Sequence, residues 1–154
     1  MTTRSPSSNN ITAPEQRGVN PVLVSSSTPT NQSLMALVIG NAKYEFSPLA
    51  NPVNDAMDIA ETLRQIGFKV TLKTNLDQVS MGTAIRQFTG RLSNQSVGLF
   101  YFAGHGTQVD GRNYLLPIDN HKIVDKQDLA AYAINVNQQV LARMEENRSH
   151  LNIV

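Results

Sequence analysis

The amino-acid sequence predicts an α/β domain built around a mostly parallel sheet. Residues 34–39 and 97–103 are wholly apolar, as expected for strands that are buried on both faces. Between them lie two segments in which apolar residues recur at helical spacing. Fully apolar strands that alternate with helices indicate a parallel sheet with helices on both sides.

The first predicted strand, residues 34–39, ends at Gly40. The helix after it is predicted to begin at Asn51 and Pro52, because Asn suits the cap position and Pro the first helical position. Gly67 is expected to end this helix. Its apolar stripe consists of Ala56, Ile59, Ala60, Leu63 and Ile66.

The second strand is predicted over residues 68–72, where apolar and polar residues alternate. Asp77 is expected to cap a second helix, which leads to the third strand, residues 97–103. The apolar face of this helix consists of Met81, Ala84, Ile85, Phe88 and Leu92.

Beyond the third strand the pattern becomes shorter. The pair Asp110-Gly111 predicts a small hairpin over residues 107–116. Either Asn135 or Asn137 could cap a third helix. Residues 151–154 look like the start of another buried strand, and strands average about five to six residues. We therefore expect a reading frame that was cut short and a sheet that is incomplete at the C-terminus.

Residues 1–33 differ from the rest of the chain. Of these 33 residues, 22 are Ser, Thr, Asn, Pro or Gln. Such a segment has too little apolar surface to offset the entropy of ordering, so we predict a disordered leader at 1–33 and a folded domain at 34–154. The apolar residues 22–24 could instead add an edge strand or act as a docking peptide.

Composition excludes several classes of protein. The 154 residues fit one domain, and the net charge of +1 argues against a nucleic-acid binder. No apolar run reaches the roughly 18 residues of a membrane span. The N-terminus lacks the apolar core of a signal peptide, so we expect a cytoplasmic protein. The chain has no cysteine, which excludes disulfides, thiolate metal sites and a cysteine nucleophile within these residues.

Two residues are candidates for chemistry at the carboxyl ends of the predicted strands, where α/β proteins place their sites. His105 stands between Gly104 and Gly106 directly after the third strand, a suitable mounting for a general base. It could instead be a turn residue at the end of a strand. Asp55 lies in the first turn of the first helix, where the helix dipole alone would favour a carboxylate.

Other polar groups predict no site. Gly40-Asn41 lacks the spaced glycines of a dinucleotide fingerprint, and no phosphate loop is present. His121 and His150 are expected at the surface. The pairs Asp125/Asp128 and Glu145/Glu146 are interpreted as solvated faces, because no loop has the ligand spacing of a calcium motif. We expect no cofactor, although calcium activation stays open.

Several motifs occur together in a characteristic order: residues 36–41 (ALVIGN), 51–56 (NPVNDA), 67–70 (GFKV), 100–106 (FYFAGHG) and 113–117 (NYLLP), followed by Asp119. Over residues 34–154 the chain resembles the large-subunit half of the caspase-like cysteine peptidases, closest to the metacaspase and bacterial caspase-like branch. The resemblance implies a caspase-like three-layer sandwich that acts on peptide or protein substrates with a His/Cys dyad.

The resemblance also implies roles for individual residues. His105 would be the dyad histidine, and the backbone N–H of Gly106 would help to bind the oxyanion. Asp55 would line the pocket that selects Arg or Lys before the scissile bond. In this family the nucleophilic cysteine follows the histidine by about 50 residues, here near position 155. These residues contain no cysteine, so we expect the chain alone to be inactive.

Three interpretations remain open at this point. The chain could be the N-terminal piece of a caspase-like peptidase. It could instead be a pseudo-peptidase module that binds or regulates a caspase-fold partner through an open sheet edge. An unrelated nucleotide-binding α/β module is disfavoured, because the sequence has no phosphate loop.

Overall fold

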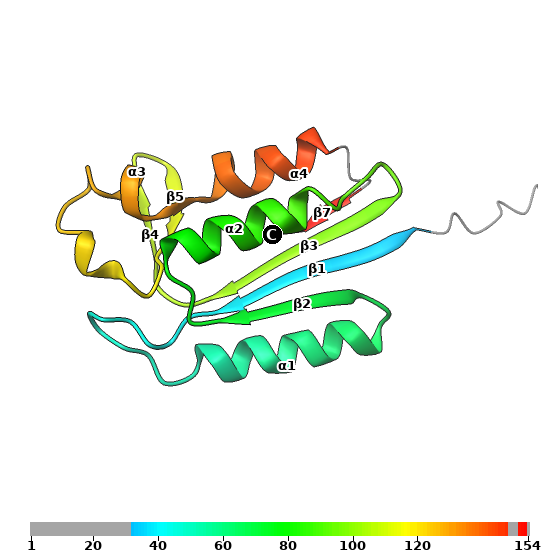
Figure 1. Ribbon diagram of the computed structural model, residues 1–154, viewed down its shortest axis with the longest axis horizontal. Coiled ribbons are helices and arrows are strands. Elements are labelled where there is room, and N and C mark those ends of the chain that lie inside the picture. The colour runs from blue at the N-terminus through cyan, green and yellow to red at the C-terminus, as the bar shows by residue number, and fades with distance from the viewer. Residues whose placement is uncertain (1–31, 148–150, 154) are drawn as a thin grey trace, which may run out of the picture.

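A computed structural model describes residues 32–147 and 151–153, and it confirms the predicted α/β fold. Four parallel strands form the central sheet in the order β2-β1-β3-β7 (Figure 1). The strands are β1 Ser33–Gly40, β2 Lys69–Thr74, β3 Ser96–Ala103 and β7 Leu151–Ile153. Residues 1–31 of the predicted leader, the alternative for residues 22–24, and His150 lie outside the described residues, whereas Ser33, predicted as part of the leader, is the first residue of β1.

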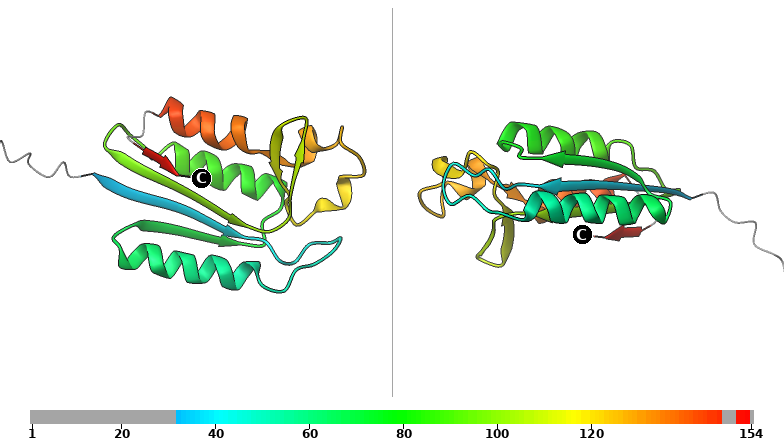
Figure 2. Two further views of the ribbon diagram at one scale, coloured as in Figure 1. Left: turned by 180° about the vertical axis from the view of Figure 1, so that it is seen from behind. Right: turned by 90° about the horizontal axis from the view of Figure 1, so that it is seen from below.

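Helices cover both faces of the sheet. Helix α1, Pro52–Gln65, lies on one face, and α2, Gln78–Thr89, lies on the other (Figure 2). Helix α4, Ala142–Glu146, packs beside α2 and continues a π-helical stretch, Val136–Leu141. The cap residues Asp77 and Asn135 each accept a backbone hydrogen bond, from Ser80 at 2.8 Å and Gln138 at 3.1 Å. Asn135, not Asn137, therefore caps the third predicted helix.

Strand β1 separates two apolar cores by its alternation. Ala36 and Val38 pack against α1, whereas Leu37 and Ile39 pack against α2 and the helical region 136–146. Gly40 permits a close approach at the end of β1, since a Cβ atom there would lie 2.7 Å from Cβ of Ala56. The N-terminus of α1 is thereby held against the carboxyl end of β1.

A smaller antiparallel sheet extends from the carboxyl end of β3. It contains β4 Gly106–Val109, β5 Arg112–Leu115 and β6 Ile134–Asn135, in that order. Asp110 and Gly111 both have positive φ, 51° and 73°, which confirms the predicted two-residue hairpin turn. The structure adds three short elements that the pattern did not predict: β6, a 3-10 turn at Asn120–Lys122, and α3, Leu129–Tyr132.

Strand register places two loops side by side. Gly40, the last residue of β1, pairs with Ala103, the last residue of β3. The segments that follow these two strands therefore begin side by side at the carboxyl end of the sheet; they are residues 41–51 and residues 104–105.

Among the described residues, no helix is long and apolar enough to cross a membrane.

Candidate active site at the carboxyl ends of β1 and β3

The side chain of His105 is held by a backbone carbonyl from the loop after β1. Its Nε2 atom lies 2.7 Å from the carbonyl oxygen of Ser47. A carbonyl oxygen only accepts hydrogen bonds, so Nε2 must carry a proton and donate it. In the neutral imidazole the lone pair is then on Nδ1, the form in which Nδ1 can accept a proton from a substrate or nucleophile.

Tyr44 supports the backbone of the same histidine. Its hydroxyl accepts a hydrogen bond from the N–H of His105 at 2.7 Å and donates one to the carbonyl of Leu116 at 3.1 Å. The centroid of its ring lies 4.5 Å from the centroid of the His105 imidazole, and the two ring planes are tilted by 54°. Burial raises the pKa of Tyr44 from 10.0 to about 12, partly offset by its hydrogen bond with His105. The hydroxyl therefore keeps the proton that it donates to Leu116 at neutral pH.

Gly104 is required by this packing. A Cβ atom at position 104 would overlap the Tyr44 hydroxyl and lie 2.7 Å from Cζ of Phe102. Contacts that short do not occur between real Cβ atoms and their neighbours. The glycine before His105 thus lets the tyrosine reach the histidine backbone.

Asn120 fixes the loop that carries Ser47. Its side chain accepts a hydrogen bond from the backbone N–H of Phe46 at 3.0 Å and donates one to the carbonyl of Phe46 at 2.8 Å. The N–H of Glu45 donates to the carbonyl of Ile118 at 2.9 Å. Ser47 itself has a φ of 64°, a left-handed conformation that costs a non-glycine residue about 1–3 kcal/mol. These contacts hold the Ser47 carbonyl toward His105 despite that cost.

Asn41 and Asn75 fix the start of the same loop. The side chain of Asn41 is fully buried, accepts from the N–H of Leu76 at 2.9 Å and donates to its carbonyl at 3.1 Å. Asn75 accepts from the N–H groups of Ala42 and Lys43, both at 3.0 Å. The loop is therefore tied to the segment after β2 as well as to residues 118–120.

The backbone N–H of Gly106, the first residue of β4, points away from the neighbouring strand β5. The N–H of Leu116 donates to the carbonyl of His105 at 2.9 Å, which makes these two residues a hydrogen-bonded pair. Such pairs alternate with non-hydrogen-bonded pairs in an antiparallel ladder, so Gly106 and Leu115 form a pair of the second kind. The N–H of Gly106 consequently points away from β5, and Gly106 is exposed.

Asp55 also lies at the carboxyl end of the sheet, but it does not contact His105. It is exposed in the first turn of α1, which begins beside the end of β1. Within residues 32–147, its carboxylate forms no hydrogen bond or ion pair. Asp55 is therefore a free negative charge near the loop that holds His105.

An apolar hollow lies next to β3 beyond its pairing with β7. Strand β7 pairs only with Val97, Gly98 and Leu99 of β3. The carboxyl half of that edge of β3 has no strand partner among the described residues. The hollow, of about 340 Å³, is lined by Phe100, Tyr101, Phe102, Leu115 and Val136.

The remaining polar residues are used in local contacts. His121, expected at the surface, is exposed and forms an ion pair with Glu45 through Nδ1. Asp128 accepts hydrogen bonds from the N–H groups of Val124 and Asp125, and thus caps a turn. In the part of the chain that the structure describes, no three His, Cys, Asp or Glu residues are grouped closely enough to hold a metal ion.

Sequence reasoning proposed His105, Gly106 and Asp55 as site residues, and these roles stay predictions; it did not anticipate the contacts that Tyr44, Ser47 and Asn120 make around His105. Asn120 carried no recognisable signal, because an Asn in a polar loop usually faces solvent. Ser47 contributes only its backbone, which any residue could supply. The aromatic Tyr44, four residues after the buried strand, is the one signal that could have suggested a support for the histidine.

Comparison with known proteins places this arrangement in a family. The profile of the caspase domain matches residues 33–145, so the chain belongs to the caspase domain family. The predicted caspase-like membership is confirmed, and the metacaspase branch stays a prediction.

Individual relatives agree with that assignment. The chain is 30% identical over 126 residues to mucosa-associated lymphoid tissue lymphoma translocation protein 1 of Homo sapiens, an alignment that covers 81% of this chain and 15% of the relative. The Mus musculus homologue is also 30% identical over 126 residues, with 14% of its length covered. Caspase-12 of Mus musculus is 35% identical over 75 residues, covering 47% of this chain and 18% of the relative. The chain thus spans a small fraction of the length of these relatives.

Proposed function

We propose that this chain forms the histidine-bearing part of a caspase-type cysteine endopeptidase, with His105 as the general base. One observation carries the proposal: the hydrogen bond from Nε2 of His105 to the Ser47 carbonyl. It leaves the Nδ1 lone pair to accept a proton from a thiol. Membership of the caspase domain family supports a peptide or protein substrate.

The nucleophile in this proposal comes from outside these residues, because the 154 residues contain no cysteine. We propose that the nucleophilic cysteine lies on a strand that pairs with the free carboxyl half of β3. A strand that continued the pairing of Ile153 with Leu99 would bring its fourth further residue opposite Ala103, two residues before His105. We therefore expect the chain alone to be inactive, and a strand with a cysteine near that position to complete the site.

The reaction then follows ordinary thiol chemistry. Nδ1 of His105 takes the thiol proton, and the thiolate attacks the scissile carbonyl carbon. The exposed N–H of Gly106 donates to the oxyanion that forms. The C–N bond breaks, and His105 passes its proton to the leaving amine. His105 then takes a proton from a water molecule, whose oxygen attacks the thioester carbonyl carbon; the C–S bond breaks, the acid product leaves, and the proton returns to the thiolate.

Asp55 supplies the specificity in this proposal. Its carboxylate is exposed, unpaired and at the same sheet edge as His105. A peptide that extends from the scissile bond toward α1 would bring the side chain before the cut close to this charge. We propose a preference for Arg or Lys at that position, since a carboxylate pairs well with either cation.

A second candidate function uses the same free edge of β3 without catalysis. The apolar hollow along Phe100 and Phe102 is suited to cover by a strand from another caspase-fold protein. In this case the chain would be a pseudo-peptidase that binds or regulates that protein. We propose a cytoplasmic location for either function.

A chimera tests the two functions. The chain is extended with the strand, the cysteine and the small-subunit half of an active relative. We expect cleavage of fluorogenic peptides after Arg or Lys, and its loss when either His105 or the new cysteine is changed to Ala. His121→Ala, which alters an exposed histidine, serves as the matched control. A folded chimera without activity, together with tight binding of the unextended chain to a caspase-fold peptidase, would instead favour the pseudo-peptidase.

A further inference from the structure

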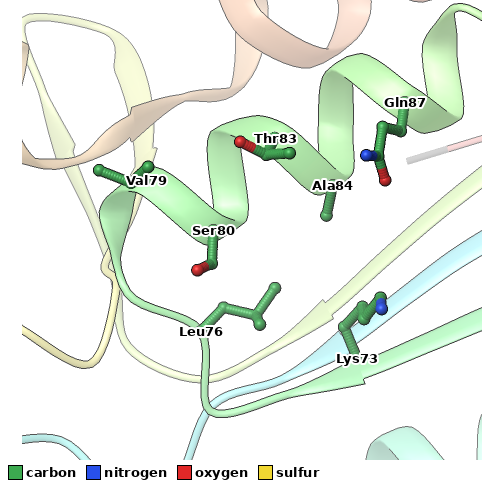
Figure 3. A pocket seen from close by; sticks show the side chains of 7 residues that line it. All are labelled: Lys73, Leu76, Val79, Ser80, Thr83, Ala84 and Gln87. Carbon is green, nitrogen blue, oxygen red and sulfur yellow. The ribbon is translucent and has the colours of Figure 1, made fainter.

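A groove runs between α2 and β2, the strand at the other lateral edge of the sheet from β3 and β7. One part of it, shown in Figure 3, has a volume of about 300 Å³. An adjoining part of about 120 Å³ shares Lys73, Ala84 and Gln87 with the first. The remaining lining residues are Leu76, Val79, Ser80 and Thr83 in the first part, and Thr71, Phe88 and Arg91 in the second.

The strand beside this groove has an open edge. Strand β2 pairs with β1 through residues 69–74, and no other described strand pairs with it. Its outer backbone N–H and C=O groups therefore face away from the sheet. An open edge of this kind is a template on which an extended segment can add as a further strand.

The two faces of β2 differ in chemistry. Val70 and Leu72 pack toward the core under α1, and both are half-buried. Because side chains alternate along a strand, Lys69, Thr71 and Lys73 lie on the face of α2. This edge of the sheet is thus apolar on one face and basic on the other.

The basic groups of the groove are not neutralised. Lys73 and Arg91 both line it, and neither forms an ion pair within the described ranges 32–147 and 151–153. Figure 3 shows the side chain of Lys73 on the sheet side of the groove, across from Gln87 and Ala84 of α2. An acidic side chain would find two cations here without displacing an existing partner.

We infer that this edge binds an extended acidic segment of a partner protein, which pairs with β2 as an added strand. The segment alternates Asp or Glu, facing Lys73 and Arg91, with Val or Ile, facing Val70 and Leu72. Cross-strand neighbours of opposite charge on one face and apolar neighbours on the other both stabilise such a pair. This interaction is independent of the proposed peptidase function.

The lysines also explain why the edge does not pair indiscriminately. Lysine on an edge strand disfavours pairing with another copy of the same strand, because like charges would lie opposite each other. The same charges admit a strand of opposite sign. The edge is therefore selective for acidic segments rather than closed to all strands.

A capped eight-residue peptide of alternating Glu and Val tests the inference. Titrated into the 15N-labelled full chain, it should shift the backbone amide signals of residues 69–74 and of the groove. Lys73→Glu or Arg91→Glu should weaken its binding by about fivefold or more, as expected when an ion pair is replaced by repulsion. Lys126→Glu, an exposed lysine without an ion pair, is the matched control and should bind as the parent does.

Four further peptides separate strand addition from simple charge attraction. A Lys/Val alternation should not bind, and a peptide with the Glu and Val residues in two blocks should bind more weakly. Two peptides carry N-methyl groups on alternate residues, one on the odd and one on the even positions. Alternate N–H groups of a strand point to opposite edges, and an added strand pairs with β2 through one edge only, so one of these peptides should lose binding and the other should keep it. Equal binding of the Lys/Val peptide, equal loss with both N-methylated peptides, or shifts confined to β3 and β7 would overturn the inference.

Discussion

The Nε2 atom of His105 lies 2.7 Å from the carbonyl oxygen of Ser47, although 58 residues separate the two in the chain. The contact joins the loops that follow the two central strands, whose last residues, Gly40 and Ala103, are in register. It determines which imidazole nitrogen carries the proton.

The first prediction concerns the tautomer of His105. In alkaline solution, where an imidazole is neutral, His105 should be protonated on Nε2 and carry its lone pair on Nδ1. The 15N chemical shifts of the two ring nitrogens measure this directly. His121 provides an internal contrast, because its Nδ1 contacts the Glu45 carboxylate and should therefore be the protonated nitrogen. Nδ1 protonation of His105 would contradict the base role.

The second prediction concerns Tyr44, whose hydroxyl is bonded to two backbone groups. Tyr44→Phe should lower the free energy of unfolding by about 1–3 kcal/mol, because the His105 N–H and the Leu116 carbonyl lose their partner. Urea denaturation measures the change. Tyr132→Phe, at a tyrosine that is 39% exposed, is the control and should lie within about 0.5 kcal/mol of the parent.

The effect of Tyr44→Phe should also depend on pH. The pKa of Tyr44 is raised to about 12 in the folded chain, above the ordinary value of 10.0. Between these values the unfolded chain loses the Tyr44 proton while the folded chain keeps it, so the stability that Tyr44 contributes falls as pH rises. The difference between parent and variant should therefore narrow from pH 9 toward pH 11. A difference that widens over this range would contradict the assignment.

The fold was accessible from sequence because its main elements have strong local patterns. Strands β1 and β3 are mostly continuous apolar runs, and α1 and α2 each have an apolar stripe. Asp77 caps α2 through its side chain, whereas α1 begins with Pro52 and the side chain of Asn51 makes no capping hydrogen bond. The two-residue strand β6 and the four-residue helix α3 have no such pattern. Strand β6 forms where the chain packs against β5 and against the helical stretch Val136–Leu141, and α3 packs against β6. These are tertiary effects that local propensity does not encode.

The candidate site was only partly accessible, for a related reason. His105 and Gly106 belong to one contiguous motif at the end of a strand, so their spacing is visible in the sequence. The partners of Asn120 are the backbone groups of Phe46, 74 residues away. A contact made by backbone atoms across that distance leaves no residue pattern, and it can be recognised only once the strands are in register.

The third prediction concerns Asn120 as a positioning residue. Asn120→Ala should release the backbone of Phe46 and loosen the Ser47 carbonyl, so the Nε2–H proton of His105 should exchange faster with water. Stability should fall by about 1–3 kcal/mol for the unpaired backbone groups. Asn120→Asp keeps an acceptor for the Phe46 N–H but cannot donate to its carbonyl, and should give a smaller effect on exchange.

Asn113→Ala is the control for Asn120. Asn113 accepts one hydrogen bond from the exposed side chain of Gln108 and does not contact the loop. Its removal should leave the His105 signals unchanged. If Asn120→Ala lowered stability but left the exchange of the Nε2–H proton as in the parent, Asn120 would have a structural role only.

The last prediction concerns Asp55 in the active chimera. The charge is exposed at the start of α1, and its loss removes a favourable interaction with the helix dipole of only about 0.3–1 kcal/mol. A pocket carboxylate has a larger effect on binding, because an Arg or Lys side chain without its partner loses a charge-assisted hydrogen bond of about 1.5–3 kcal/mol. Asp55→Asn should therefore lower kcat/KM for cleavage after Arg by about 10- to 150-fold with little change in folding. Asp58→Asn, three residues further along the same helix, is the matched control and should change neither quantity. If Asp55→Asn cleaved after Arg at the rate of the parent chimera, Asp55 would serve the helix start alone, and the specificity pocket would have to be built from other residues.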